Sequence, residues 1–236
     1  MINGKTVLAI TLARGGSRGI IKKNIVPIND KPLLCYTTDE VIKSKYIDRY
    51  IVATDDNDIE QLCNVMSSID NKIECFKRKD VSNTQTSAEG LLEVLNNIDT
   101  YDYVIEIMCT NPLKKIEDID GVIKKLDQSK SESVVSVVRI WDNHPSRVKF
   151  IENDILKGFD TNENPDIPGQ RRQDLEPPAY VRNGSIYAMT WKQITQNHQR
   201  LGNIVRPYIM PIDRTINIDE PRDLMLAKFI IENENK

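Results

Sequence analysis

The residues whose types and spacing best suit chemistry lie in a loop near the start of the chain. Residues 7–12 (VLAITL) predict a buried strand, and the loop after it contains Gly15, Gly16, Ser17 and Gly19. Its cationic side chains are Arg14, Arg18, Lys22 and Lys23. Glycines allow a sharp turn and bring backbone N–H groups close to an anion, so the loop predicts a phosphate site. The alternative is a basic surface turn.

The spacing of the glycines does not match either of the two commonest phosphate loops. A Walker A loop has four residues between its glycines and then Lys and Ser or Thr, whereas three residues separate Gly15 from Gly19 and Ile20 follows. A dinucleotide fingerprint has Gly-x-Gly-x-x-Gly, whereas this loop has Gly-Gly-x-x-Gly. Neither a P-loop ATPase nor a dinucleotide dehydrogenase is therefore favoured.

A second candidate site lies near the end of the chain, at Asn217-Ile218-Asp219. Side chains two residues apart share one face of a strand, so Asn217 and Asp219 would present two oxygen atoms to one site. Such a pair suits Mg²⁺ that also holds substrate phosphates. The alternative, compatible with the first, is that Asp219 caps a helix starting near Pro221. Because His144 and His198 are far apart, any metal site is expected to be oxygen-ligated.

Two further polar clusters are open to more than one interpretation. Arg171-Arg172-Gln173 and Arg182-Asn183-Gly184 could bind a carboxylate or phosphate, or could form a solvated loop. Thr54-Asp55-Asp56 could supply catalytic carboxylates, but capping of the next helix is the favoured interpretation.

Composition sets the broad class of the protein. The 236 residues are 39% hydrophobic and 28% charged with a net charge of −3, which predicts one large domain and does not favour nucleic-acid binding. Membrane attachment is not expected, because apolar runs are too short to span a bilayer, and no signal-peptide pattern is present. The scattered cysteines predict four reduced thiols and a cytoplasmic protein.

Strand and helix patterns alternate over the first 140 residues. Strands are expected at 7–12, 49–54, 72–76, 101–108 and 133–138, and helices from Lys31-Pro32-Leu33-Leu34, from Asp56 to about Ser67, and around 88–95 and 116–126. This alternation predicts an α/β fold with a mostly parallel sheet, helices on both faces and ligands at the carboxyl ends of the strands.

The alternation breaks after Arg139. A hairpin is expected from 147–151 and 155–159, joined by Glu-Asn-Asp, and a proline-rich stretch follows, so residues 139–180 predict an inserted arm. Regular structure is expected to resume at 184–190, 208–212 and 215–219, with a final helix at about 221–232.

In their order along the chain these motifs resemble the CMP-N-acylneuraminate synthetase family, cytidylyltransferases that activate sialic-type acids. The matching motifs are Arg14-Gly15-Gly16-Ser17-Arg18 with Lys23-Asn24, Lys31-Pro32-Leu33, Thr54-Asp55-Asp56, Thr110-Asn111-Pro112-Leu113, Arg172-Gln173-Asp174-Leu175, Asn183-Gly184-Ser185-Ile186-Tyr187 and Asn217-Ile218-Asp219. The resemblance implies transfer of CMP from CTP to the anomeric hydroxyl of a nonulosonic acid, with release of pyrophosphate. It also implies one Rossmann-like nucleotidyltransferase domain over 1–236 and a homodimer in which the arm at 139–180 reaches over the partner's site.

The resemblance assigns roles residue by residue. Arg14, Lys23 and Asp219 would be catalytic, and Asp219 and Asn217 would hold Mg²⁺ or Mn²⁺. The nucleotide would be bound by Arg14, Gly15, Ser17, Lys23, Asn24, Arg78, Thr86 and Ser87. The sugar acid would be bound by Met108, Asn111, Arg172, Gln173 and Asn183.

Three positions depart from the family pattern. Asn217 replaces the first aspartate of the metal pair, and Lys79 follows Arg78 where proline is common. Met108 and Asn111 stand where the family has Gln and Ser, which suggests an altered sugar pocket, for legionaminic or pseudaminic acid. The alternatives are a transferase for the eight-carbon acid KDO, whose usual Ser-x-Arg-Leu-Pro-Gly-Lys loop is absent, and a nucleotide-binding protein with little turnover.

Overall fold

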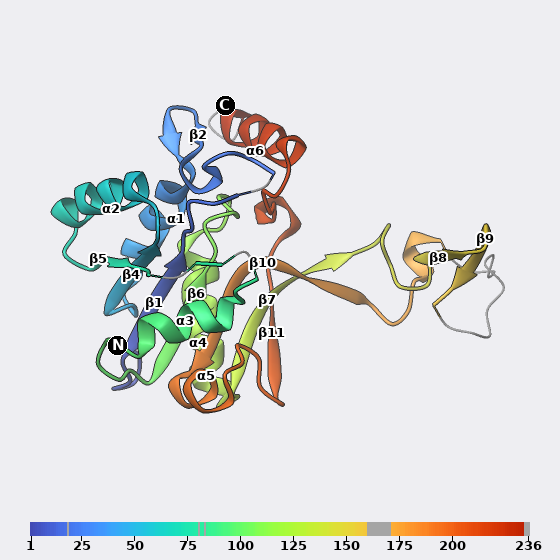
Figure 1. The fold of residues 1–236 in the computed structure, drawn as a ribbon. Coiled ribbons are helices and arrows are strands. Elements are labelled where there is room, and N and C mark those ends of the chain that lie inside the picture. The colour runs from blue at the N-terminus through green and yellow to red at the C-terminus, as the bar shows by residue number, and fades with distance from the viewer. Residues whose placement is uncertain (18, 80, 83, 160–170, 234–236) are drawn as a thin grey trace.

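The centre of the molecule is a seven-stranded sheet, seen in a computed structural model that describes residues 1–17, 19–79, 81–82, 84–159 and 171–233 (Figure 1). The strand order is β11-β7-β10-β6-β1-β4-β5. The strands are β1 (Val7–Leu12), β4 (Arg49–Thr54), β5 (Ile73–Lys77), β6 (Tyr103–Ile107), β7 (Ser133–Ile140), β10 (Ala179–Thr190) and β11 (Val205–Ile209). Only β10 is antiparallel to its neighbours in this sheet.

Helices cover both faces of the sheet, as the sequence predicts. They are α1 (Leu33–Ile42), α2 (Asn57–Ile69), α3 (Ser87–Leu95), α4 (Ile116–Ser129), α5 (Trp191–Asn197) and α6 (Pro221–Asn233). Apolar side chains of α1, α2 and α4 join one core cluster, and those of α3 and α5 join a second. Alternation along β1 separates the two faces, since Val7 and Ala9 belong to the first cluster and Leu8 and Ile10 to the second.

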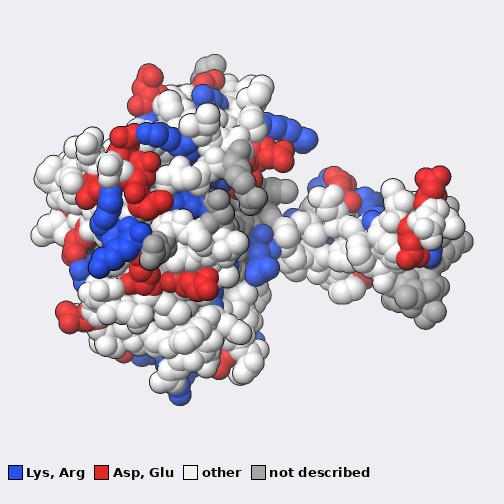
Figure 2. Space-filling model, in the orientation of Figure 1, with Lys and Arg blue, Asp and Glu red and all other residues white. Residues whose placement is uncertain are grey.

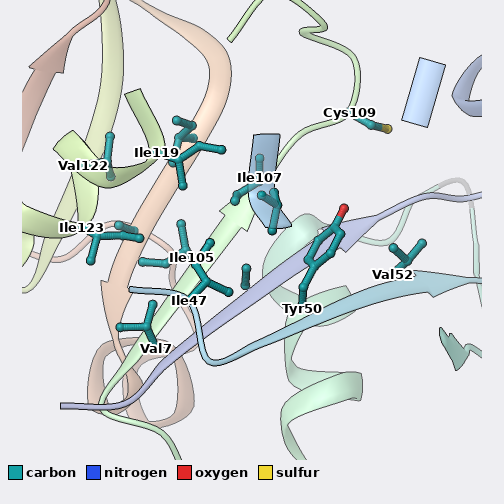
Figure 3. Packing of buried hydrophobic residues seen from close by; sticks show 14 of the residues in the cluster. Val7, Ile47, Tyr50, Val52, Ile105, Ile107, Cys109, Ile119, Val122 and Ile123 are labelled. Carbon is teal, nitrogen blue, oxygen red and sulfur yellow. The ribbon is translucent and has the colours of Figure 1, made fainter. Parts of the chain in front are cut away.

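The first cluster is the larger of these two and holds α4 against the middle of the sheet. Figure 3 shows Ile105 and Ile107 of β6 beside Ile119 and Ile123 of α4, with Tyr50 of β4 close by. All five side chains are buried. This packing fixes the carboxyl end of β6 relative to β1 and β4, where the candidate site lies.

Several short elements connect the helices and strands. They are β2 (Pro27–Ile28), β3 (Lys31–Pro32) and the 3₁₀ turns η1 (Lys23–Ile25), η2 (Arg172–Asp174) and η3 (Ile212–Arg214). Lys31 and Pro32 thus form a strand, and the helix expected to open at Lys31 begins two residues later, at Leu33. The expected strand at 215–219 is wrong, because the segment pairs with no strand of the sheet; its side chains still alternate, with Ile216 and Ile218 buried and Asn217 and Asp219 exposed.

An arm projects from the sheet, formed by extensions of β7 and β10 and by a separate hairpin (Figure 1). The hairpin pairs β8 (Lys149–Glu152) with β9 (Ile155–Gly158), so the expected hairpin is confirmed. Its turn consists of Asn153 and Asp154, both with positive φ, and Glu152 belongs to the strand. Residues 160–170 of the expected arm lie outside the described residues.

The helices, the cysteines and the surface charges can be compared with what the composition predicts. Among the described residues, no helix has both the length and the apolar character needed to cross a membrane. All four cysteines are free, as predicted. Acidic and basic side chains are interspersed over the face that Figure 2 shows, without one continuous basic surface.

Candidate active site

A cleft of about 390 Å³ lies at the carboxyl ends of β1 and β6. Of the residues predicted to act on a nucleotide or metal, it is lined by Arg14, Ser17, Lys23, Asn24, Arg78, Thr86, Ser87, Asn217 and Asp219. These residues come from the first loop, the turn after β5, the start of α3 and the segment before α6. The tertiary structure therefore gathers most of the predicted site in one place.

The first loop is tied to the strands beneath it by Asn24. The Asn24 side chain is buried and donates from Nδ2 to the Arg14 carbonyl oxygen at 2.8 Å, while its Oδ1 accepts from Cys109 Sγ at 3.1 Å. Asn24 thus lines the cleft while its amide group is hydrogen-bonded within the protein. These two hydrogen bonds connect the first loop to the end of β6.

The glycine at position 15 is needed for close packing. Its N–H donates to Asp55 Oδ1 at 2.8 Å, and a Cβ added there would lie 2.7 Å from Asp56 Cβ. Asp56 in turn caps α2, since its Oδ1 accepts from the backbone N–H groups of Asp58 and Ile59 at 2.8 and 3.1 Å. The capping interpretation of Asp56 is confirmed. Gly15 does not line the cleft, whereas Gly16 does.

The cations of the loop have different surroundings. Lys22 does not line the cleft and pairs with Asp58 on the surface. Lys23 points into the cleft, where its Nζ donates to Asp219 Oδ1 at 2.7 Å. Arg18, predicted as one of these cations, lies outside the described residues. Lys23 and Arg14 are therefore the loop cations that the described part of the structure offers to a ligand.

Asp219 belongs to a chain of side-chain hydrogen bonds. Asn217 Nδ2 donates to Asp219 Oδ2 at 2.6 Å, and Asn217 Oδ1 accepts from Thr110 Oγ1 at 2.7 Å. The interpretation of Asp219 as the helix cap is wrong: Asp223 Oδ2 accepts from the N–H groups of Asp219 and Glu220 at the start of α6. These two N–H groups lower the pKa of Asp223. The carboxylate of Asp219 is thus left to face the cleft.

At the other side of the cleft, Arg78 is buried and held rigidly. Its Nε donates to Glu93 Oε2 at 3.1 Å, and its Nη2 donates to Gln85 Oε1. Thr86 is the N-cap of α3 and forms a reciprocal capping box with Glu89, whose pKa is lowered by the Thr86 backbone N–H. Ser87 is the first residue of that helix, so its N-terminus borders the cleft.

A second hollow of about 340 Å³ adjoins the first, because Asn217 lines both. Its other lining residues are Val138, Val181, Arg182, Asn183, Gly184, Tyr187, Arg200 and Thr215. Asn183, predicted for the sugar, lies here and is buried; its Oδ1 accepts from Ser136 Oγ at 2.7 Å. Met108, also predicted for the sugar, lines the first cleft.

The other three predicted sugar contacts are not brought to these hollows. Asn111 is fully buried and lines neither, and its side-chain amide has no hydrogen-bond partner among the described residues. Arg172 and Gln173 lie exposed in η2 on the arm. The Arg172 guanidinium sits 5.0 Å from the centre of the Trp141 ring, so this part of the arm is ordered around an aromatic side chain.

The sequence analysis missed Lys114, which is fully buried below the cleft. Its Nζ donates to Thr37 Oγ1 at 2.7 Å, to the Met108 carbonyl at 2.8 Å and to the Asn111 carbonyl. Burial lowers the pKa of Lys114 to about 7. The ammonium ties together the loop that follows β6. No local signal in the sequence distinguishes Lys114 from the adjacent Lys115, which is only partly buried.

The parallel strands with a glycine-containing basic loop at their carboxyl edge define an α/β protein of the nucleotide-binding class. A model of the cytidylyltransferase family matches residues 8–223. The chain therefore belongs to the cytidylyltransferase family, and the resemblance found in the sequence is confirmed. It is a nucleotidyltransferase enzyme.

Individual relatives agree with this assignment. CMP-N,N'-diacetyllegionaminic acid synthase of Legionella pneumophila is 28% identical, over 96% of this chain and 96% of the relative. N-acylneuraminate cytidylyltransferase of Escherichia coli is 26% identical over 98% of this chain, which spans only 53% of that relative. Among solved structures, CMP:2-keto-3-deoxy-manno-octonic acid synthetase complexed with CTP has a TM-score of 0.72 at 17% identity, covering 97% of this chain and 99% of that one. That likeness is one of fold.

Proposed function

We propose that this enzyme transfers CMP from CTP to the anomeric hydroxyl of a nonulosonic acid and releases pyrophosphate. The observation that carries the proposal is the pair of adjoining hollows that share Asn217, one of them bordered by the basic loop. Such an arrangement suits a nucleotide in the first hollow and an acceptor in the second. The names of the relatives from Legionella pneumophila and Escherichia coli support this acceptor class.

In the proposed reaction the anomeric oxygen of the acceptor forms a bond to the α-phosphorus of CTP, the bond from that phosphorus to the oxygen that bridges it to the β-phosphorus breaks, and the hydroxyl proton passes to solvent water. Arg14, Ser17 and Lys23 hold the triphosphate. Lys23 Nζ exchanges its contact with Asp219 for a phosphate oxygen and stabilises the charge that grows on the α-phosphate. The rigid cleft aligns the attacking oxygen with the leaving group, so that positioning supplies much of the rate.

The base and ribose are proposed to lie toward Arg78, Thr86 and Ser87. Arg78 is immobilised by Glu93 and Gln85 before any ligand arrives, so contact with the nucleotide would cost little side-chain entropy. The positive end of α3, at Thr86 and Ser87, favours an electron-rich group beside it.

We further propose that Asp219 holds a divalent cation, Mg²⁺ or Mn²⁺, with Asn217 beside it. Their oxygen atoms, one carboxylate and one amide, are of the kind that hard cations prefer. The Asn217 amide now turns its nitrogen toward Asp219, so its oxygen becomes a ligand only if the amide rotates. When bound, the cation would neutralise charge on the phosphates of CTP.

The arm is proposed to join two copies of the chain in a homodimer. The hairpin exposes apolar side chains, at Phe150, Ile151, Ile155, Leu156 and Phe159. An isolated two-stranded hairpin is marginally stable, so packing of these exposed side chains against a partner chain would stabilise it. Arg172 and Gln173 do not line the hollows of their own chain. In a dimer, the arm would bring these two residues toward the acceptor site of the partner.

The experiment is pyrophosphate release from CTP with a panel of acceptors. The panel contains N-acetylneuraminic, N,N'-diacetyllegionaminic and pseudaminic acids, with KDO to test the eight-carbon alternative. We expect release with a nonulosonic acid, formation of the CMP-sugar and no reaction with ATP. Release with KDO alone would establish the alternative transferase. Tight CTP binding with no release from any acid would establish a nucleotide-binding protein with little turnover.

A further inference from the structure

The central strand β6 contains one charged residue, Glu106, in an otherwise apolar segment, Tyr103–Ile107. Its side chain is 1% exposed. It lies on the same face of the sheet as Val104, which belongs to the core cluster under α3 and α5. A carboxylate buried in such surroundings is costly unless its oxygen atoms are satisfied. The surroundings of the two carboxylate oxygen atoms of Glu106 therefore indicate what the residue does.

One oxygen of Glu106 is satisfied by Arg200. Arg200 Nη1 donates to Glu106 Oε2 at 2.7 Å, and the guanidinium carbon lies 4.1 Å from the centre of the Tyr187 ring. Tyr187 stands directly opposite Glu106 in the antiparallel pairing of β10 with β6. Arg200 is thus held between an aromatic ring and a carboxylate, and it fixes the orientation of Glu106.

The other oxygen, Glu106 Oε1, has no hydrogen-bond partner among the described residues and is buried. Glu106 lines the first cleft, and its partner Arg200 lines the second hollow. The ion pair therefore stands between the two hollows. This is where an acceptor in the second hollow must approach a nucleotide in the first.

We propose that Glu106 determines acceptor specificity, by accepting at Oε1 a hydrogen bond from a hydroxyl or amide N–H group of the sugar acid. Arg200 is the positioning residue for this contact. The inference deepens the proposed function and rests on it. A neutral donor is indicated, because the charge of Glu106 is already balanced by Arg200. The carboxylate and phosphate groups of the substrates would be repelled by Glu106, so they face the basic loop instead.

The variant Glu106→Gln tests this contact with little change in shape. Arg200 requires an acceptor, so the glutamine oxygen takes the place of Oε2 and its NH₂ group takes the place of Oε1. The atom offered to the substrate thereby changes from acceptor to donor. The probe is whichever of N,N'-diacetyllegionaminic, N-acetylneuraminic and pseudaminic acids the wild type uses, and we expect kcat/KM for that acid to fall about 10- to 100-fold, chiefly through KM. The KM for CTP should change less than about 2-fold.

The positioning role of Arg200 is tested by measuring KM and kcat separately in an Arg200 variant, and by asking whether a conservative replacement restores the KM. Arg200→Met should raise the KM for the acid as Glu106→Gln does, and Arg200→Lys should restore part of the loss. Asp127→Asn is the control, because Asp127 is another buried acid in an ion pair, with Lys5, at the opposite end of β6 beside Tyr103. Asp127→Asn should lower the melting temperature and leave the KM for the acid unchanged.

The outcomes separate the two proposals. If the wild type uses none of these three nonulosonic acids, the proposed function fails and this inference fails with it. If the wild type is active and Glu106→Gln keeps its KM for the acid, or instead raises the KM for CTP, only the inference is overturned. Thermal melting and CTP binding of each variant, measured without acceptor, establish that a change in KM comes from a folded protein.

Discussion

Lys23 Nζ lies 2.7 Å from Asp219 Oδ1, although 196 positions separate the two residues in the chain. The Lys23 side chain is 15% exposed and that of Asp219 is 61% exposed. The ion pair therefore balances a mostly buried cation with a carboxylate that remains accessible from the cleft. In the proposed reaction, the triphosphate pairs with Lys23 in place of Asp219 and leaves the carboxylate free for a metal ion.

Replacement of Lys23 should affect catalysis more than binding. We expect Lys23→Gln to lower kcat by about 100-fold or more, because its charge acts on the phosphate charge that develops in the transition state. The dissociation constant for CTP, measured by calorimetry, should rise much less. Lys22→Gln is the matched control, since Lys22 pairs with Asp58 outside the cleft. A loss of CTP affinity with normal kcat would contradict this role for Lys23.

Asp219 and Asn217 should differ in their effect on metal dependence. Asp219→Asn removes the carboxylate of the pair and should nearly abolish turnover at any Mg²⁺ concentration. Asn217→Asp adds a second anionic ligand and should lower the Mg²⁺ concentration needed for half-maximal rate. Initial rates over an Mg²⁺ titration decide both. Should Asp219→Asn keep the wild-type titration curve, the metal ion is held elsewhere.

Neighbouring glycines of the first loop should respond differently to alanine. A Cβ at position 15 would lie 2.7 Å from Asp56 Cβ, whereas a Cβ at position 16 would meet nothing within 4 Å. We expect Gly15→Ala to destabilise the protein by about 1–3 kcal/mol, because Asp56 must shift and α2 loses its cap. Gly16→Ala should change the free energy of unfolding by less than about 0.5 kcal/mol. Urea denaturation measures both, and equal losses would rule out the steric explanation.

Lys114 should make stability depend on pH. Burial lowers its pKa in the folded state to about 7, from 10.5 for an ordinary lysine. Between these values the unfolded chain binds more protons than the folded one, so the contribution of Lys114 to the free energy of unfolding rises with pH. The penalty for charging the buried amine is fully present below pH 7.

Urea denaturation of wild type and Lys114→Met from pH 7 to 9 tests this prediction. The difference in the free energy of unfolding, wild type minus variant, should increase across that window. Burial raises the pKa of Cys109 to about 11, which makes stability fall at pH values above the ordinary thiol pKa of 9.0, so the window from pH 7 to 9 stays below the range in which Cys109 contributes. A difference that stays constant would show that Lys114 titrates normally.

The arm should control assembly. Light scattering of the wild type is expected to give the mass of a dimer. Ile151→Glu places a charge on an exposed apolar side chain of the hairpin, 73% exposed, and should shift the equilibrium toward monomer. Ile69→Glu is the control, because Ile69 is 79% exposed on α2, away from the arm. If the wild type is a monomer by light scattering and is fully active, no residue of a partner chain is needed to complete the site.

Local patterns in the sequence were sufficient for most of the elements and for the position of the basic glycine loop after the first strand. The strand at 7–12, the cap at Asp56 and the hairpin follow from side-chain periodicity and backbone preference, which depend on near neighbours in the chain, although the predicted turn of the hairpin included Glu152, which belongs to β8. The resemblance of the ordered motifs to cytidylyltransferases is confirmed for the same reason, since the residue types themselves carry it.

Tertiary structure alone decided which side chains meet. Lys22 and Lys23 are alike in the sequence, but the turn at η1 directs Lys23 toward Asp219 and leaves Lys22 with Asp58. Glu106 and Arg200 are 94 positions apart, and their ion pair exists because β10 lies beside β6 and returns the chain to the same face of the sheet. Such pairings depend on strand order and on burial, which set the cost of leaving a charge unpaired and which no local pattern encodes.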